Sequence, residues 1–199
     1  MPLLRHILIC YTNKVKLSQE LIYFIFPLLF AGLIHHLLII HYDLWPFLGI
    51  PFDGGIKFRG RPLFGKAKTL RGFIIVPFLS SIGMVLVSNV ITLNIIINPL
   101  LLGFYTGLGY CLAELPNSFI KRRMGIPEGL KTTGNFKFFF GIVDQIDSIL
   151  GALIVLTFFY PVTLELFLSL LIMGGLIHYL VDLCLYKFSY KKGLKKSYQ

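Results

Sequence analysis

Five long apolar runs constrain the fold of this chain more than any other feature. They cover residues 21–41, 73–93, 97–115, 141–160 and 164–186. Each is close to the roughly 20 residues that a helix needs to cross the hydrocarbon core of a bilayer. Only 14% of the residues are charged, against about 25% in a typical soluble domain. We therefore expect an all-α fold, a polytopic integral membrane helix bundle of about five transmembrane helices, in a single domain over 1–199.

The positions of the 19 Lys and Arg residues predict how the bundle sits in the membrane. Six lie in the loop 42–72, five in the loop 116–140 and five in the tail 187–199, and the short connections hold none. With five spans, both loops and the tail fall on one side, which the positive-inside rule makes cytoplasmic. The expected location is the cytoplasmic (inner) membrane, with the N-terminus outside and residues 1–20 as an interfacial segment.

Asp144 and Asp147 stand at the start of the fourth apolar run. At spacing i, i+3 they share one face of a helix. A carboxylate near hydrocarbon is costly unless it binds a cation or faces a wet cavity. One Asp at a helix start is explained as an N-cap or a macrodipole partner, but two on one face fit that explanation less well. We favour a magnesium site, because Mg²⁺ keeps several waters and takes further ligands from substrate phosphates.

The two long loops supply cations and hydroxyls among glycines, which suits phosphate. Lysine and arginine donate charge-assisted hydrogen bonds to phosphate oxygens, and glycine lets the backbone approach a ligand closely. The residues that could act in this way are Lys68, Thr69, Arg71, Ser118, Lys121 and Arg122. The alternative is that both loops are ordinary positive-inside clusters.

The fifth apolar run carries a second polar pair, His178 and Asp182, at spacing i, i+4. Such residues can pair inside a bundle. A structural pair and a catalytic role are equally open on this pattern. His35 and His36 are adjacent in the first run and point in different directions, so they do not predict a metal site.

At these residues the chain resembles the CDP-archaeol synthase family, membrane cytidylyltransferases related to bacterial CDP-diacylglycerol synthases. The resemblance runs from about Leu44 to the C-terminal tail. Five segments carry it, namely Pro51–Gly55, Phe58–Arg61, Lys68–Gly72, Ser118–Gly125 and Asp144–Asp147. Each segment alone is weak, but their order, with apolar runs between them, is specific.

The resemblance implies that CTP and a lipid phosphate react to give a CDP-lipid and pyrophosphate, with Mg²⁺ as cofactor. The implied catalytic residues are Lys121, Arg122, Asp144 and Asp147. The implied nucleotide- or phosphate-binding residues are Lys68, Thr69, Arg71, Ser118, Arg123 and Arg61. The implied metal ligands are Asp144, Asp147 and Glu114. The expected partners are CTP, the lipid phosphate and the bilayer, with no nucleic acid; assembly as a homodimer stays open.

Two departures from the family pattern indicate a divergent member. The family usually has Gly-Asp where this chain has Ala113-Glu114, and an aspartate where it has Lys66. The acceptor therefore need not be archaeol phosphate, and loss of activity is an open alternative. Two other functions stay open as well: a CTP-dependent polyprenol or phytol kinase, and a non-catalytic transporter or membrane partner. The loops offer more cations than bases, which favours a phosphate acceptor over an alcohol.

Overall fold

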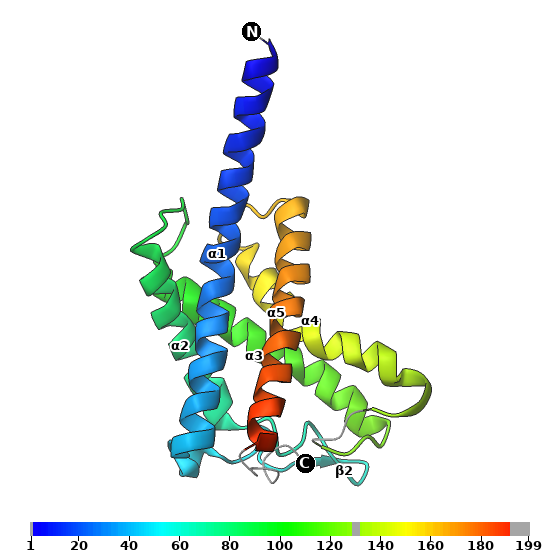
Figure 1. Ribbon diagram of the computed structural model, residues 1–199. Helices are drawn as coiled ribbons and strands as arrows, with labels where there is room; N and C mark the ends of the chain where they lie inside the picture. Colours follow the sequence, from blue (N-terminus) through cyan, green and yellow to red (C-terminus); the bar gives the residue numbers. More distant parts are fainter. Residues whose placement is uncertain (1, 129–131, 192–199) are drawn as a thin grey trace.

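Five long helices make up the bundle in the computed structural model, which describes residues 2–128 and 132–191 (Figure 1). The helices are α1 Pro2–Tyr42, α2 Leu70–Ser88, α3 Pro99–Arg123, α4 Lys137–Leu156 and α5 Leu164–Lys191. The short elements are η1 Pro46–Leu48, β1 Lys57–Phe58, β2 Arg61–Pro62 and η2 Gly134–Phe136.

Four of the described helices contain a segment that is long and apolar enough to cross a membrane. These segments are Thr12–Ile39, Leu70–Ser88, Lys137–Leu156 and Leu164–Leu185. The remaining helix, α3, is the least apolar, because it carries Glu114 and ends in three basic residues. By length and composition the chain is an all-α integral membrane protein, which confirms the predicted fold class. The predicted span at 97–115 lies in α3 and is not among these four segments.

The long and the short connections between helices lie at opposite ends of the bundle (Figure 1). The long ones, α1–α2 and α3–α4, lie at the same end as the last described turn of α5, and the short ones lie at the other end. This is the arrangement that five spans predict. Residues 2–20 continue α1 as a helix, which projects beyond the rest of the bundle at the end remote from the long connections.

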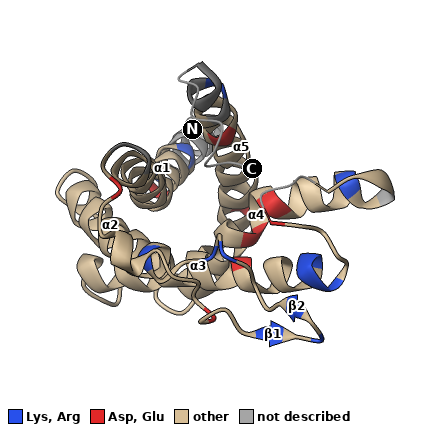
Figure 2. Cartoon of the chain, turned by 90° about the horizontal axis from the view of Figure 1, so that it is seen from below, with Lys and Arg blue, Asp and Glu red and all other residues tan. Residues whose placement is uncertain are grey.

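α3 lies between α2 and α4 and packs against both at short range (Figure 2). A Cβ on Gly107 would lie 2.8 Å from Pro77 Cα of α2, and a Cβ on Gly109 would lie 2.8 Å from the Gly151 carbonyl oxygen of α4. Small residues let helix backbones approach this closely in membranes. These contacts fix how α3 is rotated, and therefore which of its residues face α4.

The α1–α2 connection is held by its own side chains. The Asp53 carboxylate accepts hydrogen bonds from the backbone N–H of Gly55 and of Phe64, both at 2.9 Å. Strands β1 and β2 pair as an antiparallel hairpin whose turn residues, Arg59 and Gly60, have φ of 51° and 77°. Two positive φ values in succession match the turn type that suits a two-residue hairpin.

Two arginines attach this hairpin to the last turn of α3. The Arg123 guanidinium donates to the carbonyls of Phe58, Arg61 and Pro62, and Arg61 donates to the Arg123 carbonyl at 2.6 Å. The Arg123 guanidinium also lies over the Phe58 ring, 5.3 Å from its centroid. These contacts therefore hold the hairpin against the last turn of α3.

Candidate active site

Asp144 and Asp147 lie well inside α4, which starts at Lys137 with Phe136 as its N-cap residue. They are beyond the first turn, so the capping alternative does not apply. The Asn117 side chain of α3 donates from Nδ2 to Asp144 Oδ1 and to Asp147 Oδ2, both at 2.7 Å. One amide therefore holds the two carboxylates together from the neighbouring helix.

A lysine from α3 pairs with this carboxylate pair. Lys121 Nζ bonds Asp144 Oδ1, and its side chain is only 13% exposed. It also lies over the Phe140 ring, 5.4 Å from the centroid. Lys121 and Asp144, two of the implied catalytic residues, are therefore in contact.

Glu114, which stands where the family usually has aspartate, reaches the same place. Ser148 Oγ donates to Glu114 Oε1 at 2.8 Å, and the Ser148 N–H donates to Asp147 Oδ1 at 2.7 Å. The other Glu114 oxygen accepts from Lys68 Nζ. We call Glu114, Asp144 and Asp147, with Asn117 and Ser148 between them, the carboxylate cluster.

Lys68 lies just before α2 and brings the first loop to this cluster. Burial disfavours its ammonium, but the Glu114 carboxylate and their hydrogen bond outweigh this effect and raise the pKa of Lys68 above its ordinary value. Lys68 is therefore a cation at neutral pH, available to a phosphate that displaces Glu114 or shares it.

The donor set of the carboxylate cluster fits a hard divalent cation. Asp144 and Asp147 offer carboxylate oxygens, and the buried Asn117 Oδ1 has no hydrogen-bond partner. Carboxylate and amide oxygens are the ligands that Mg²⁺ takes in proteins. Across residues 2–128 and 132–191, no group of three or more His, Cys, Asp or Glu side chains is placed to hold a metal ion. Glu114 as a third ligand therefore stays a prediction.

Two of the predicted phosphate-binding residues and the predicted catalytic residue Arg122 have other contacts in this structure. Thr69 is the N-cap of α2, where its Oγ1 accepts from Gly72 N–H at 3.3 Å. Arg71 pairs with Asp43 at 2.7 Å, next to the end of α1. Arg122 donates to the Ile126 carbonyl, beyond the end of α3. For these three residues, binding to phosphate stays a prediction.

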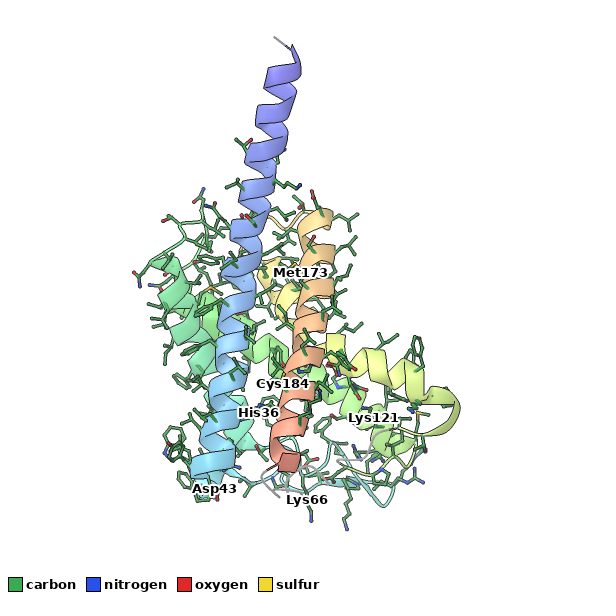
Figure 3. The ribbon with its side chains drawn as sticks, viewed as in Figure 1. His36, Asp43, Lys66, Lys121, Met173 and Cys184 are labelled. Carbon is green, nitrogen blue, oxygen red and sulfur yellow. The ribbon has the colours of Figure 1, made fainter. Side chains whose placement is uncertain are left out.

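The other three predicted residues are less available. Arg61 and Arg123 are both used in the attachment of the hairpin to α3. Ser118 is buried, next to Asn117 on α3. The departure at Lys66 lies at the outer end of the loops, where Lys66 N–H donates to Glu128 Oε2 at 2.7 Å (Figure 3).

A cavity of about 260 Å³, lined by both polar and apolar side chains, opens beside Lys68 and Glu114; we call it the polar cavity. Its walls come from α1, the start of α2, α3 and α5. The described residues that give it polar character are His35, His36, Lys68, Thr69, Glu114 and His178. In this structure His178 pairs through Nε2 with the Tyr110 hydroxyl at 3.2 Å, and Asp182 is exposed. The open alternative of a His178–Asp182 pair is therefore not observed.

Asn117 and Ser148 were not predicted as site residues. Their signal in the sequence is weak but present, because Glu114, Asn117 and Lys121 follow the spacing i, i+3, i+7 of one helix face. Ser148 directly follows Asp147, a position that spacing alone does not single out.

Comparison with known proteins agrees with the geometry. The family model of the CarS-like CDP-archaeol synthases matches residues 15–196. The chain belongs to this family. The resemblance seen in the five sequence segments is thereby confirmed.

Members of the family from several archaea are similar to this chain. A CDP-archaeol synthase of Thermococcus gammatolerans is 32% identical over 157 residues, which cover 72% of this chain and 81% of that protein. Another from Saccharolobus islandicus is 36% identical over 115 residues, or 56% of this chain. The chain covers 61% of the length of that relative.

A solved structure shares the fold. It is described as an intramembrane enzyme for archaeal membrane lipids biosynthesis, and it superposes with a TM-score of 0.61 at 24% identity. The superposition covers 81% of this chain and 92% of that one.

Proposed function

We propose that this protein transfers a cytidylyl group from CTP to a membrane lipid phosphate and releases pyrophosphate. Asp144 and Asp147 carry this proposal, because Asn117 and Lys121 hold them together at the loop end of the bundle. Lys68 and Glu114 stand next to them through Ser148. Carboxylates and cations placed together in a membrane bundle suit a metal-bound triphosphate. Membership of the CDP-archaeol synthase family is the independent support.

In this reaction an oxygen of the lipid phosphate attacks the α-phosphorus of CTP. A new phosphorus–oxygen bond forms as the bond to the β-phosphate oxygen breaks, and pyrophosphate leaves. The nucleophile is already an anion, so positioning and charge neutralisation are the main tasks of the protein. Lys121 and Arg122, one turn past Ser118 on α3, would neutralise the triphosphate and the leaving pyrophosphate. Lys68 would neutralise the charge of the attacking phosphate.

Asp144 and Asp147, with Glu114 as the predicted third ligand, would hold Mg²⁺, and the Asn117 amide would orient the two aspartates. A bound Mg²⁺ supplies positive charge that offsets the repulsion between the triphosphate and the incoming phosphate. By the positive-inside rule, the basic residues of the loops support a cytoplasmic location for this chemistry. Assembly as a homodimer stays a prediction, which a mass measurement in detergent would test.

Pyrophosphate release by the purified protein tests the proposal. The assay contains CTP, Mg²⁺ and a panel of two-chain lipid phosphates with ether-linked isoprenoid or ester-linked acyl chains. We expect pyrophosphate with at least one lipid, and a loss on the order of 100-fold or more for Asp144→Asn and Asp147→Asn. Asp182→Asn, an exposed position on α5, is the matched control and should retain activity.

Other outcomes point elsewhere. Formation of CDP in place of pyrophosphate with a lipid alcohol would identify a kinase. A protein that binds no CTP would exclude both enzymes.

A further inference from the structure

Two cavities inside the bundle share part of their lining and differ in character. The polar cavity of about 260 Å³ lies toward the loops, and an apolar cavity of about 80 Å³ adjoins it. Four residues line both of them, which makes the two cavities neighbours in space: Leu28, Gly32, Tyr110 and His178. The hydrogen bond between Tyr110 and His178 lies where the lining changes from polar to apolar.

The polar cavity has the groups that an anionic headgroup needs. Lys68 supplies an ammonium, and it is the only Lys or Arg among the described residues that line the cavity. His35 contributes a buried Nε2 that has no hydrogen-bond partner. A single ammonium, here paired with the Glu114 carboxylate that a phosphate could displace, suits one phosphate group rather than a triphosphate. Glu114, in the same wall, already holds Lys68 at the edge of the carboxylate cluster.

The apolar cavity suits a hydrocarbon chain. Its walls come mainly from α1, α4 and α5, and include Leu29, Leu153, Leu156, Leu170 and Ile177. A cavity lined in this way stays dry and takes apolar ligands. Because it adjoins the polar cavity, one amphipathic molecule can occupy both.

We infer that the joined cavities are the acceptor site, with the phosphate of the lipid in the polar cavity and hydrocarbon of the lipid in the apolar one. This inference rests on the proposed cytidylyl transfer, and it separates the two substrates. The acceptor approaches the carboxylate cluster from the Lys68 and Glu114 side, and CTP from the Lys121 and Arg122 side. Tyr110 and His178 set the level at which headgroup ends and chain begins, so they are specificity residues for the acceptor.

Gly32 offers a way to block this site without disturbing the fold. It lines both cavities, and a Cβ added there meets nothing within 4 Å. Because Gly32 lines both cavities, we expect the side chain of Gly32→Leu to fill part of the cavity space and the methyl group of Gly32→Ala to fill less of it. Gly141 on α4 also has open space around its Cβ but lines neither cavity. Gly141→Leu and Gly141→Ala are the matched controls.

The experiment measures equilibrium binding of a radiolabelled two-chain lipid phosphate without CTP, and of CTP with Mg²⁺ without lipid. We expect Gly32→Leu to raise the Kd for the lipid phosphate at least tenfold and Gly32→Ala to raise it less, with the Kd for CTP unchanged. Both Gly141 variants should bind both ligands as the wild type does. Thermal unfolding in detergent checks that every variant is folded. If Gly32→Leu is unfolded, the lipid-phosphate Kd of Gly32→Ala tests the acceptor site.

Two results would overturn the acceptor site. One is wild-type affinity for the lipid phosphate in both folded Gly32 variants. The other is a wild-type protein that binds no lipid phosphate of either chain type. Turnover is read separately: a protein that binds lipid phosphate in a Gly32-dependent way but releases no pyrophosphate would refute the proposed reaction and leave the site standing.

Discussion

Asn117→Ala should weaken the apparent affinity for Mg²⁺ while leaving the helix intact. The Asn117 amide donates to both Asp144 and Asp147 at 2.7 Å, so its removal leaves two adjacent carboxylates without the donor that they share. Alanine is the best helix former, so α3 itself gains from the change.

The size of the effect follows from these two bonds. A hydrogen bond to a charged group contributes roughly 1.5–3 kcal/mol. Because a single amide makes both bonds, their contributions are not independent, and we take about 1.5–3 kcal/mol for the pair. At 1.4 kcal/mol per factor of ten, this is about a 10- to 100-fold loss of affinity. Residues that orient metal ligands show losses of this size when they are mutated.

The assay is pyrophosphate release as a function of Mg²⁺ concentration at saturating CTP and lipid phosphate. Asn117→Ala should shift the half-maximal Mg²⁺ concentration upward by that factor and recover much of its rate at high Mg²⁺. Asn94→Ala, an exposed position in the α2–α3 connection, is the control. A variant with the wild-type Mg²⁺ dependence would show that Asn117 does not organise a metal site, and the reasoning from the carboxylate pair would fail.

Two further predictions concern what positions the site. Gly109→Ala puts a Cβ 2.8 Å from the Gly151 carbonyl oxygen. We therefore expect this variant to lower the free energy of unfolding by about 1–3 kcal/mol, measured by thermal unfolding in detergent. The control variant Gly141→Ala should not lower it, and equal stability of the two variants would contradict the close packing. Arg123→Ala removes the guanidinium that donates to three hairpin carbonyls, so amide hydrogen exchange in β1 and β2 should become at least about tenfold faster. The exposed Lys57→Ala is the control there, and unchanged exchange in Arg123→Ala would show that the hairpin does not depend on this residue.

The bundle could be predicted from the sequence because apolar runs of membrane length leave few alternatives. The helix ends could not. α3 continues to Arg123 and α4 starts at Lys137, whereas the apolar runs end at 115 and start at 141. Helical hydrogen bonding continues past the point where side chains stop being apolar, so hydropathy locates a membrane segment and not a helix terminus.

Some residues of the candidate site could be predicted from the sequence, and others could not. Charged residues near the membrane stand out, so Asp144, Asp147 and Lys121 could be named from the sequence, and the structure brings them together. Asn117 could not be named, because a neutral polar residue has many uses in a helix. The binding of phosphate by Arg123 stays a prediction, whereas its contacts with carbonyls of a hairpin 61 to 65 residues away could not be predicted. Every residue has a backbone carbonyl, so the sequence does not show which carbonyls an arginine will contact.

The central position of α3 determines which of its residues can be substituted during evolution. Its glycines touch the backbones of α2 and α4, and another of its faces carries the residues that meet the carboxylates. A one-residue insertion would turn everything beyond it by about 100°, and no single substitution elsewhere would restore both interfaces. Substitutions are tolerated best on the outward side of α3, where Leu101, Tyr105 and Leu112 are 42–45% exposed. Substitutions accepted during evolution should therefore gather on that strip, where the surrounding lipid requires only an apolar surface.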